Sequence, residues 1–200
     1  VGVIPNEPIV GNKVRDGDVI VGLASNGLHS NGYTLARRAL LAHFKEKGKR
    51  CANYEINQIF EPTGLPICDE MLRPTKIYVR VIMEALDRLN VHGLAHITGR
   101  GLQKLRRLSL ASHIGLVIDN LPSPPLIMQE IQKVRMKTLA QMYGIFNMGI
   151  GFCVALPKEE VADLLGICQR HKVGAYVIGH ASSRFRGSVK LIFGKRSVVF

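Results

Sequence analysis

A loop between residues 25 and 32 combines glycines with hydroxyl and amide side chains. Glycine lets a backbone approach a ligand closely, and N–H groups that precede a helix N-terminus form a natural cradle for phosphate. The loop matches neither G-x-x-x-x-G-K-[ST] nor G-x-G-x-x-G, so an ordinary capped turn is the alternative interpretation. The residues that would contact an anion are Ser25, Asn26, Gly27, Ser30 and Asn31.

His29 lies inside this loop and is the candidate for a catalytic role. An imidazole titrates near neutral pH, so it could act as a general acid or base, or donate a hydrogen bond to phosphate as a cation. The alternative is a loop histidine that takes no part in chemistry.

Two further glycine segments could join the same site. Thr98-Gly99-Arg100-Gly101 supplies a guanidinium that suits bidentate phosphate contacts, and the segment 147–151 supplies an amide and a flexible backbone. Each segment lies at the end of a predicted strand or at the entrance to one, so we expect the segments to converge. The candidate binding residues are Thr98, Gly99, Arg100, Gly101, Asn147 and Gly149.

The pattern of Cys and His residues predicts no metal site. Cys51, Cys68, Cys153 and Cys168 are far apart and form no C-x-x-C pair, which indicates reduced thiols and a cytoplasmic protein. His92 and His96 have a spacing of four residues, but they lie in an apolar run that reads as a strand, and two histidines alone rarely hold a metal.

The chain is strongly basic, with 27 Lys and Arg against 15 Asp and Glu and a formal net charge of +12. Such a balance favours anionic partners, namely phosphorylated metabolites, nucleotides, nucleic acid or an acidic domain. The cations are scattered and are not interleaved with aromatic residues as in proteins that bind single strands, so a solvated basic face is the alternative for each cluster.

Two hundred residues that are 46% hydrophobic can form one sizeable domain or two small ones. No apolar stretch approaches the roughly 18 residues of a membrane-spanning helix. The chain starts at Val1 without an initiator Met and without a basic segment followed by an apolar one, so we expect no secretory signal and a start within a longer protein.

Strands and helices alternate along the sequence, which predicts one α/β (α+β) domain over 1–200 with a mixed sheet flanked by helices. A helix that opens at Pro74-Thr75 has an apolar stripe that includes Ile77, Val81 and Ala85. The predicted strands are 19–24, 92–97, 114–118, 152–156, 175–178 and 189–193. The predicted helices are 33–44, the one from 74, 102–108, one or two within 126–143, and one after Pro157. Residues 48–70 read as an irregular surface segment.

Four blocks resemble the aminoimidazole ribonucleotide synthetase (phosphoribosylformylglycinamidine cyclo-ligase) family. Residues 22–35, Gly-Leu-Ala-Ser-Asn-Gly-Leu-His-Ser-Asn-Gly-Tyr-Thr-Leu, are similar to its G-L-x-S-x-G-x-H-S-N-G-Y-[ST]-L block. Residues 72–79 resemble L-x-P-T-[RK]-I-Y-V, residues 91–99 resemble V-H-x-[IL]-A-H-[IL]-T-G, and residues 146–151 resemble F-N-x-G-[IV]-G. The resemblance covers nearly the whole chain.

The resemblance implies the C-terminal α/β domain of such an enzyme, without the N-terminal domain that supplies most ATP and Mg²⁺ contacts and forms the homodimer. It implies the ATP-dependent cyclisation of formylglycinamidine ribonucleotide in purine biosynthesis, with the segment 25–31 near the substrate or its phosphate and His29 in a chemical role. We expect the isolated fragment to be inactive.

One residue departs from the family pattern, because the family usually shows three glycines after the position of Thr98 and this chain has Arg100 as the second of them. A divergent or repurposed paralogue would explain this departure. Two further alternatives are a related ATP-dependent enzyme of the same superfamily, against which the block His-Ser-Asn-Gly-Tyr at 29–33 argues, and a stand-alone module that binds nucleotide or nucleic acid through its +12 charge.

Overall fold

The apolar, β-branched run that follows the turn at Asp16-Gly17-Asp18 forms strand β1 inside a seven-stranded sheet. The computed structural model describes residues 8–200. The strand order is β4-β6-β1-β7-β5-β8-β9, and every neighbouring pair is antiparallel except β5 and β8, so the sheet is mixed as predicted. The strands are β1 (Val19–Ala24), β4 (Gly93–His96), β5 (Gly115–Ile118), β6 (Ile150–Leu156), β7 (Ala175–Ser182), β8 (Val189–Phe193) and β9 (Arg196–Val199).

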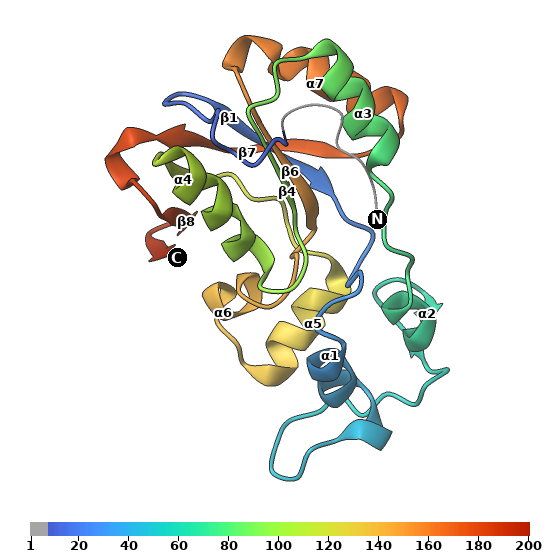
Figure 1. Cartoon of the computed structure of the whole chain (residues 1–200). Coiled ribbons are helices and arrows are strands. Elements are labelled where there is room, and N and C mark those ends of the chain that lie inside the picture. Colours follow the sequence, from blue (N-terminus) through green and yellow to red (C-terminus); the bar gives the residue numbers. More distant parts are fainter. Residues whose placement is uncertain (1–7) are drawn as a thin grey trace.

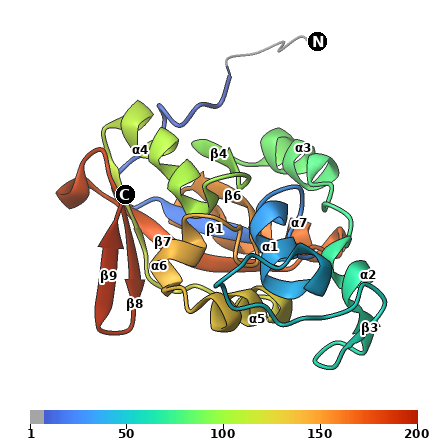
Figure 2. The same ribbon diagram turned by 90° about the horizontal axis from the view of Figure 1, so that it is seen from below.

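Helices cover both faces of this sheet (Figures 1 and 2). On one face α3 packs against α7, and on the other lie α1, α4, α5 and α6. The helices are α1 (Tyr33–Leu40), α2 (Ile67–Met71), α3 (Val79–Arg88), α4 (Arg106–Ser112), α5 (Leu126–Arg135), α6 (Leu139–Tyr143) and α7 (Val161–Arg170). The 3-10 turns are η1 (Ala42–Phe44), η2 (Gly101–Leu105), η3 (Lys158–Glu160) and η4 (Ser183–Phe185). A small hairpin of β2 (Ile59–Phe60) and β3 (Leu65–Pro66) precedes α2.

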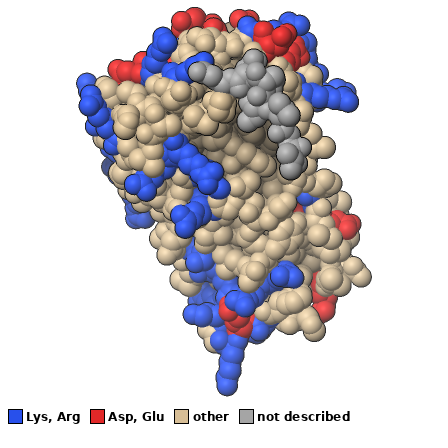
Figure 3. All heavy atoms as spheres, in the orientation of Figure 1, with Lys and Arg blue, Asp and Glu red and all other residues tan. Residues whose placement is uncertain are grey.

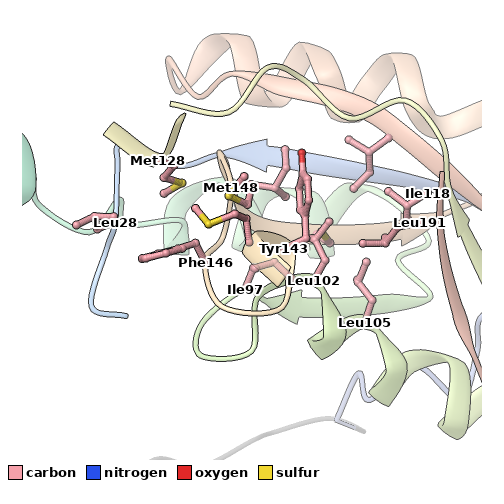
Figure 4. Close-up of a cluster of buried hydrophobic side chains, with 14 of the residues drawn as sticks. Leu28, Ile97, Leu102, Leu105, Ile118, Met128, Tyr143, Phe146, Met148 and Leu191 are labelled. Atoms are coloured by element: carbon pink, nitrogen blue, oxygen red, sulfur yellow. The ribbon is translucent and has the colours of Figure 1, made fainter. Parts of the chain in front are cut away.

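The alternation of side chains along β1 divides the core into two clusters. Ile20 points to the cluster under α1 and α5, whereas Val21 and Leu23 point to the cluster under α3 and α7. The first cluster also contains Leu28, which reaches from the loop after β1 toward the side chains that surround Phe146 (Figure 4). The loop that follows β1 is therefore anchored in the core at its middle.

The helix predicted from Pro74 begins five residues later, at Val79. The backbone of the preceding segment is used for tertiary contacts, since the carbonyl oxygen of Pro74 accepts a hydrogen bond from the side-chain amide of Asn26 at 3.2 Å. Ile77, which we assigned to the buried stripe, is 79% exposed. The prediction was wrong for this turn because periodicity does not reveal such contacts.

Other differences concern the ends of elements. The helix predicted over 33–44 is broken at Leu41, where the backbone is extended, and the predicted helix over 102–108 is a 3-10 turn followed by α4. The strand β9 was missed, and β7 and β8 do not pair with each other because β5 lies between them. Among residues 8–200, no helix has the length and apolar character that a membrane crossing requires.

Candidate functional site

The loop between β1 and α1 is held in a tight path by its glycines. Gly32 caps α1 with a left-handed backbone (φ 77°), and a side chain at this position would collide with the ring of Phe146. Only glycine combines that backbone with that close packing. The beginning of α1 and the position of the loop therefore depend on Gly32.

Asn147 joins this loop to the segment before β6. Its buried side-chain amide donates to the carbonyl oxygen of Gly27 at 2.8 Å and to that of Leu28 at 3.3 Å. Its amide oxygen accepts from the Ser25 hydroxyl at 2.8 Å and from the backbone N–H of Gly149 at 2.9 Å. One side chain thus satisfies four polar groups from two segments of the chain, which explains why the type of this residue matters.

His29 is buried, with 4% of its surface exposed, and has a left-handed backbone (φ 56°). Its Nε2 accepts from the backbone N–H groups of Asn26, at 3.2 Å, and Lys76, at 3.4 Å. Burial, together with the neighbouring His96 and Lys76, lowers its pKa from 6.5 to about 4. The ring is therefore neutral at pH 7, and its proton is on Nδ1 because Nε2 accepts. That Nδ1 is buried and finds no partner within residues 8–200.

The extended segment before α3 covers one side of the loop. The hydroxyl groups of Ser30 and Thr75 are 3.2 Å apart, and the carbonyl oxygen of Ala24 accepts from the Tyr78 hydroxyl at 2.9 Å. Burial raises the pKa of Tyr78 well above its usual value, so the hydroxyl stays protonated and donates. These contacts lock the segment against the end of β1.

An apolar groove lies beside this segment, with a volume of about 370 Å³. The ring of His96 stacks on Phe152 at 5.8 Å between centroids, and Tyr78 lies 6.3 Å from His96. Burial, with a smaller effect of Lys104, lowers the pKa of His96. The groove is lined by Lys76, Ile77, Tyr78, Val79, Ile82, Met83, His96 and Phe152.

The segment Thr98–Gly101 approaches the loop 25–32 at Gly99. A side chain at Gly99 would lie 3.2 Å from the Asn31 amide oxygen, so the two segments are neighbours. Gly101 is packed against the backbone carbonyls of Tyr143 and Phe146, where no side chain would fit. Arg100 is exposed and lines a separate hollow with the cations of η2 and α4.

The predicted convergence of the three glycine segments is thus seen for the loop 25–32 and the segment 147–151, and Gly99 borders them. Lys76, Tyr78 and Phe152 also contribute to this site and were not predicted as site residues. The signal that could have found the first two was present, because the block at 72–79 includes both residues.

The histidines at 92 and 96 contact different groups. Nδ1 of His92 lies 2.7 Å from a carboxylate oxygen of Asp18 and both side chains are buried, whereas His96 faces the groove. Within the described part of the chain, no group of three or more His, Cys, Asp or Glu is arranged to hold a metal ion.

Three of the curated relatives that match this chain have the same name, phosphoribosylformylglycinamidine cyclo-ligase. The protein from Methanococcus vannielii is 41% identical over 174 residues, which are 87% of this chain and 47% of the relative. The protein from Methanocaldococcus jannaschii is 38% identical over 197 residues (98% and 53%), and that from Bacillus pumilus is 36% identical over 183 residues (90% and 50%). The chain spans about half the length of these relatives.

Solved structures with the same fold have low sequence identity. E. coli HypE, a hydrogenase maturation protein, matches with a TM-score of 0.58 and 15% identity over 95% of this chain and 50% of its own. Thiamine-monophosphate kinase from Stenotrophomonas maltophilia matches with 0.58 and 14% (92% and 52%), and T. maritima PurL complexed with ATP with 0.53 and 16% (95% and 25%). These likenesses establish the fold of the chain.

The model of one protein family covers residues 15–192, and its description is "AIR synthase related protein, C-terminal domain". The matched region contains the loop, the covering segment before α3, the glycine turn after β4 and the Asn147 segment. The chain therefore belongs to the family of AIR synthase related proteins and matches their C-terminal domain over residues 15–192.

Proposed function

We propose that this chain is the C-terminal half of a phosphoribosylformylglycinamidine cyclo-ligase of purine biosynthesis. The relatives with that name and the family match support the proposal. The observation that carries it is the bonding of the loop 25–32 by Asn147, because buried hydrogen bonds join two blocks of the family pattern that are 120 residues apart. A nearly prearranged set of donors suits a polar, phosphorylated substrate.

The reaction would close the imidazole ring of aminoimidazole ribonucleotide. ATP phosphorylates the amide oxygen of formylglycinamidine ribonucleotide, an internal nitrogen attacks the activated carbon, and phosphate leaves with that oxygen while a proton is released. The products are ADP, phosphate and aminoimidazole ribonucleotide. The chain would hold the ribonucleotide or its phosphate through Ser25, Asn26, Gly27, Ser30, Asn31, Thr98 and Gly99. Asn147 and Gly149 would keep the loop in position, since the buried Asn147 side chain is already bonded to the loop and to the N–H of Gly149.

In this proposal His29 acts as a neutral imidazole. Its low pKa of about 4 argues against the cationic role, and its engaged Nε2 argues against a role as general base from that atom. The remaining polar group is Nδ1–H, which could donate to the substrate once the loop has adjusted to it. His29→Ala in the intact enzyme should lower kcat far more than stability, and unchanged kcat would rule out the catalytic role.

The other half of the active enzyme would come from the N-terminal domain. We infer that this domain supplies most contacts to ATP and Mg²⁺, forms most of the homodimer interface, and that the enzyme acts in the cytoplasm. The relatives are about twice as long as this chain, so a second half of similar size belongs to each of them.

The groove beside α3 is where we expect the N-terminal domain to dock. Ile77, Val79 and Met83 are 79%, 63% and 61% exposed, although they form one apolar surface with the groove. Apolar patches of this kind commonly mark interfaces. The groove shares Tyr78 with the loop contacts, so a domain that covers the groove would also close over the loop.

The proposal is tested by thermal unfolding of this chain with formylglycinamidine ribonucleotide and, separately, with Mg-ATP. A ligand that binds only the folded state raises the Tm. We expect a rise with the ribonucleotide and little change with Mg-ATP. The intact enzyme should then form aminoimidazole ribonucleotide, and the absence of that product with both substrates present would overturn the proposal.

A further inference from the structure

A hollow of about 650 Å³ lies on the outer side of η2 and α4. Four of the residues that line it are cations, namely Arg100, Lys104, Arg106 and Arg107. Figure 3 shows Lys and Arg side chains gathered over the part of the surface where α4 runs, while the Asp and Glu seen on this face lie along its top and in its lower half. The other lining residues are Gly99, Gln103, Leu110 and Phe200.

The cations of the hollow are not neutralised by the part of the chain that the structure describes. None of the four takes part in an ion pair with Asp or Glu of residues 8–200, whereas Arg38, Arg73 and Arg170 each pair with a Glu at 2.7–3.0 Å. Like charges in one hollow repel each other, and an anion placed among them would remove that repulsion. The hollow thus concentrates positive charge as an anion-binding site does, and no Asp or Glu of residues 8–200 pairs with its four cations.

The backbone at Arg100 gives a second, independent indication. Arg100 is left-handed (φ 70°) and lies between two glycines, so a glycine would fit this position with less strain. Its side chain forms no hydrogen bond within residues 8–200 that would offset the strain. Residues held in sparsely populated backbone regions cluster at ligand sites.

The hollow borders the candidate site but is separate from it. Gly99 lines the hollow, and a side chain on it would lie 3.2 Å from Asn31 of the loop. Burial and, to a smaller extent, Lys104 lower the pKa of His96, so the field of Lys104 reaches the groove. A ligand in the hollow would therefore be felt electrostatically by the neighbouring site.

We propose that this hollow is a binding site for an oligophosphate, a group of two or three linked phosphates that is either free or the tail of a nucleotide. A phosphate monoester carries about two negative charges at pH 7 and would leave half of the four cations unmatched, whereas a triphosphate carries about four. The site is additional to the loop 25–32 and does not depend on the proposed function.

The test is isothermal titration calorimetry of this chain with sodium tripolyphosphate, ATP without Mg²⁺, and inorganic phosphate, at low and at physiological salt. We expect one tripolyphosphate per chain, bound at least 10-fold more tightly than phosphate, with an affinity that decreases as salt is added. Equal affinity for ATP and tripolyphosphate indicates that the phosphates alone are recognised, and tighter binding of ATP indicates a nucleotide as the source.

Arg100→Gly is the decisive variant because glycine accepts the left-handed backbone. It should weaken tripolyphosphate binding at least 10-fold without lowering the Tm of the ligand-free chain. The double variant Lys104→Gln with Arg107→Gln should weaken it further. Arg50→Gln is the matched control, since it removes one exposed cation from the segment between α1 and α2, which lies away from α4 (Figure 1), and it should change the affinity less than 2-fold.

Three outcomes would overturn the proposal: no saturable binding at low salt, an equal loss with Arg50→Gln, or an oligonucleotide that binds at least 10-fold more tightly than tripolyphosphate and depends on Arg100. The last outcome would indicate a nucleic-acid surface. His29→Ala should leave tripolyphosphate binding intact while it weakens the response to the ribonucleotide, so this inference and the proposed function can fail separately.

Discussion

The side-chain amide of Asn147 donates a 2.8 Å hydrogen bond to the carbonyl oxygen of Gly27, across 120 positions of sequence. The same amide group accepts from Ser25 and Gly149. A single buried side chain thus sets the distance between the loop after β1 and the segment that enters β6. The geometry of the candidate site therefore depends on this residue.

Replacing Asn147 with Ala should lower the free energy of unfolding by about 3 kcal/mol, because buried polar groups lose their partners. Ser25→Ala removes only one of these bonds and should cost about 1 kcal/mol. Urea unfolding of both variants measures the difference. If Asn147→Ala costs no more than Ser25→Ala, the amide does not organise the loop as we describe.

Gly151→Ala should displace the side chains of Tyr78 and His29 in the candidate site. The added methyl group would collide with the Tyr78 hydroxyl and lie 2.7 Å from Cε1 of His29, and neither ring can move freely. We expect the free energy of unfolding to fall by about 3 kcal/mol, which is at the upper end of the effects of overpacking. Ribonucleotide binding should also weaken. Thermal unfolding with and without the ligand measures both effects.

The matched control is Gly166→Ala in α7, where the nearest atom to the new methyl group is 3.8 Å away at the end of the Arg170 side chain. Alanine is more favourable than glycine inside a helix, so the free energy of unfolding of this variant should rise by about 0.5–1 kcal/mol. A similar loss in both variants would contradict the tight packing at Gly151.

The folded chain should lose stability as the pH falls from 6.5 to 4, because His29 stays neutral when folded and is protonated when unfolded. Its folded pKa of about 4 is below the unfolded value of 6.5, so the unfolded state binds more protons in this window and stability decreases with decreasing pH. At pH 4 this difference in pKa should lower the free energy of unfolding by about 3 kcal/mol relative to pH 7, because each pKa unit corresponds to about 1.36 kcal/mol.

The variant His29→Asn isolates this effect, since asparagine tolerates the left-handed backbone and does not titrate. The difference in unfolding free energy between pH 7 and pH 4 should be about 3 kcal/mol smaller in the variant. An NMR titration of the His29 ring should show a midpoint near 4. A midpoint near 6.5 would show that the ring is open to solvent.

Charges placed on the apolar surface beside the groove should block docking of the N-terminal domain. Ile77→Lys and Met83→Glu alter exposed side chains, so the Tm of this chain should change little, while its association with the separately expressed domain should weaken at least 10-fold. Leu65→Lys on β3, which is also partly exposed, is the control. Unchanged association in both variants would place the interface elsewhere.

Much of the sheet could be predicted from the sequence because its strands are apolar runs with clear boundaries. The strand at Val19–Ala24 and the two helices within 126–143 follow from local pattern and turn residues. The strand at Arg196–Val199 does not, because it carries exposed side chains and is stabilised by pairing with β8. Pairing partners far apart in sequence leave no periodic signal.

The sequence predicted which segments form the candidate site, but not how these segments are arranged in space. The glycine segments could be recognised from composition. The hydrogen bond from the Asn26 side chain to the Pro74 carbonyl oxygen could not, because it involves a segment whose apolar pattern resembles a helix. The burial of His29 was also unpredicted, since a polar loop is usually exposed. Its environment depends on Tyr78 and Gly151, which belong to other elements.

Leu28 gives the loop a property that its polar residues alone would not. Its side chain is fully buried in the cluster with Phe146, so the loop cannot swing away from the sheet without withdrawing a leucine from the core. Such a withdrawal would cost about 1.5–3 kcal/mol. The donors of the loop are consequently preorganised, and a ligand that meets them loses little conformational entropy in fixing their positions.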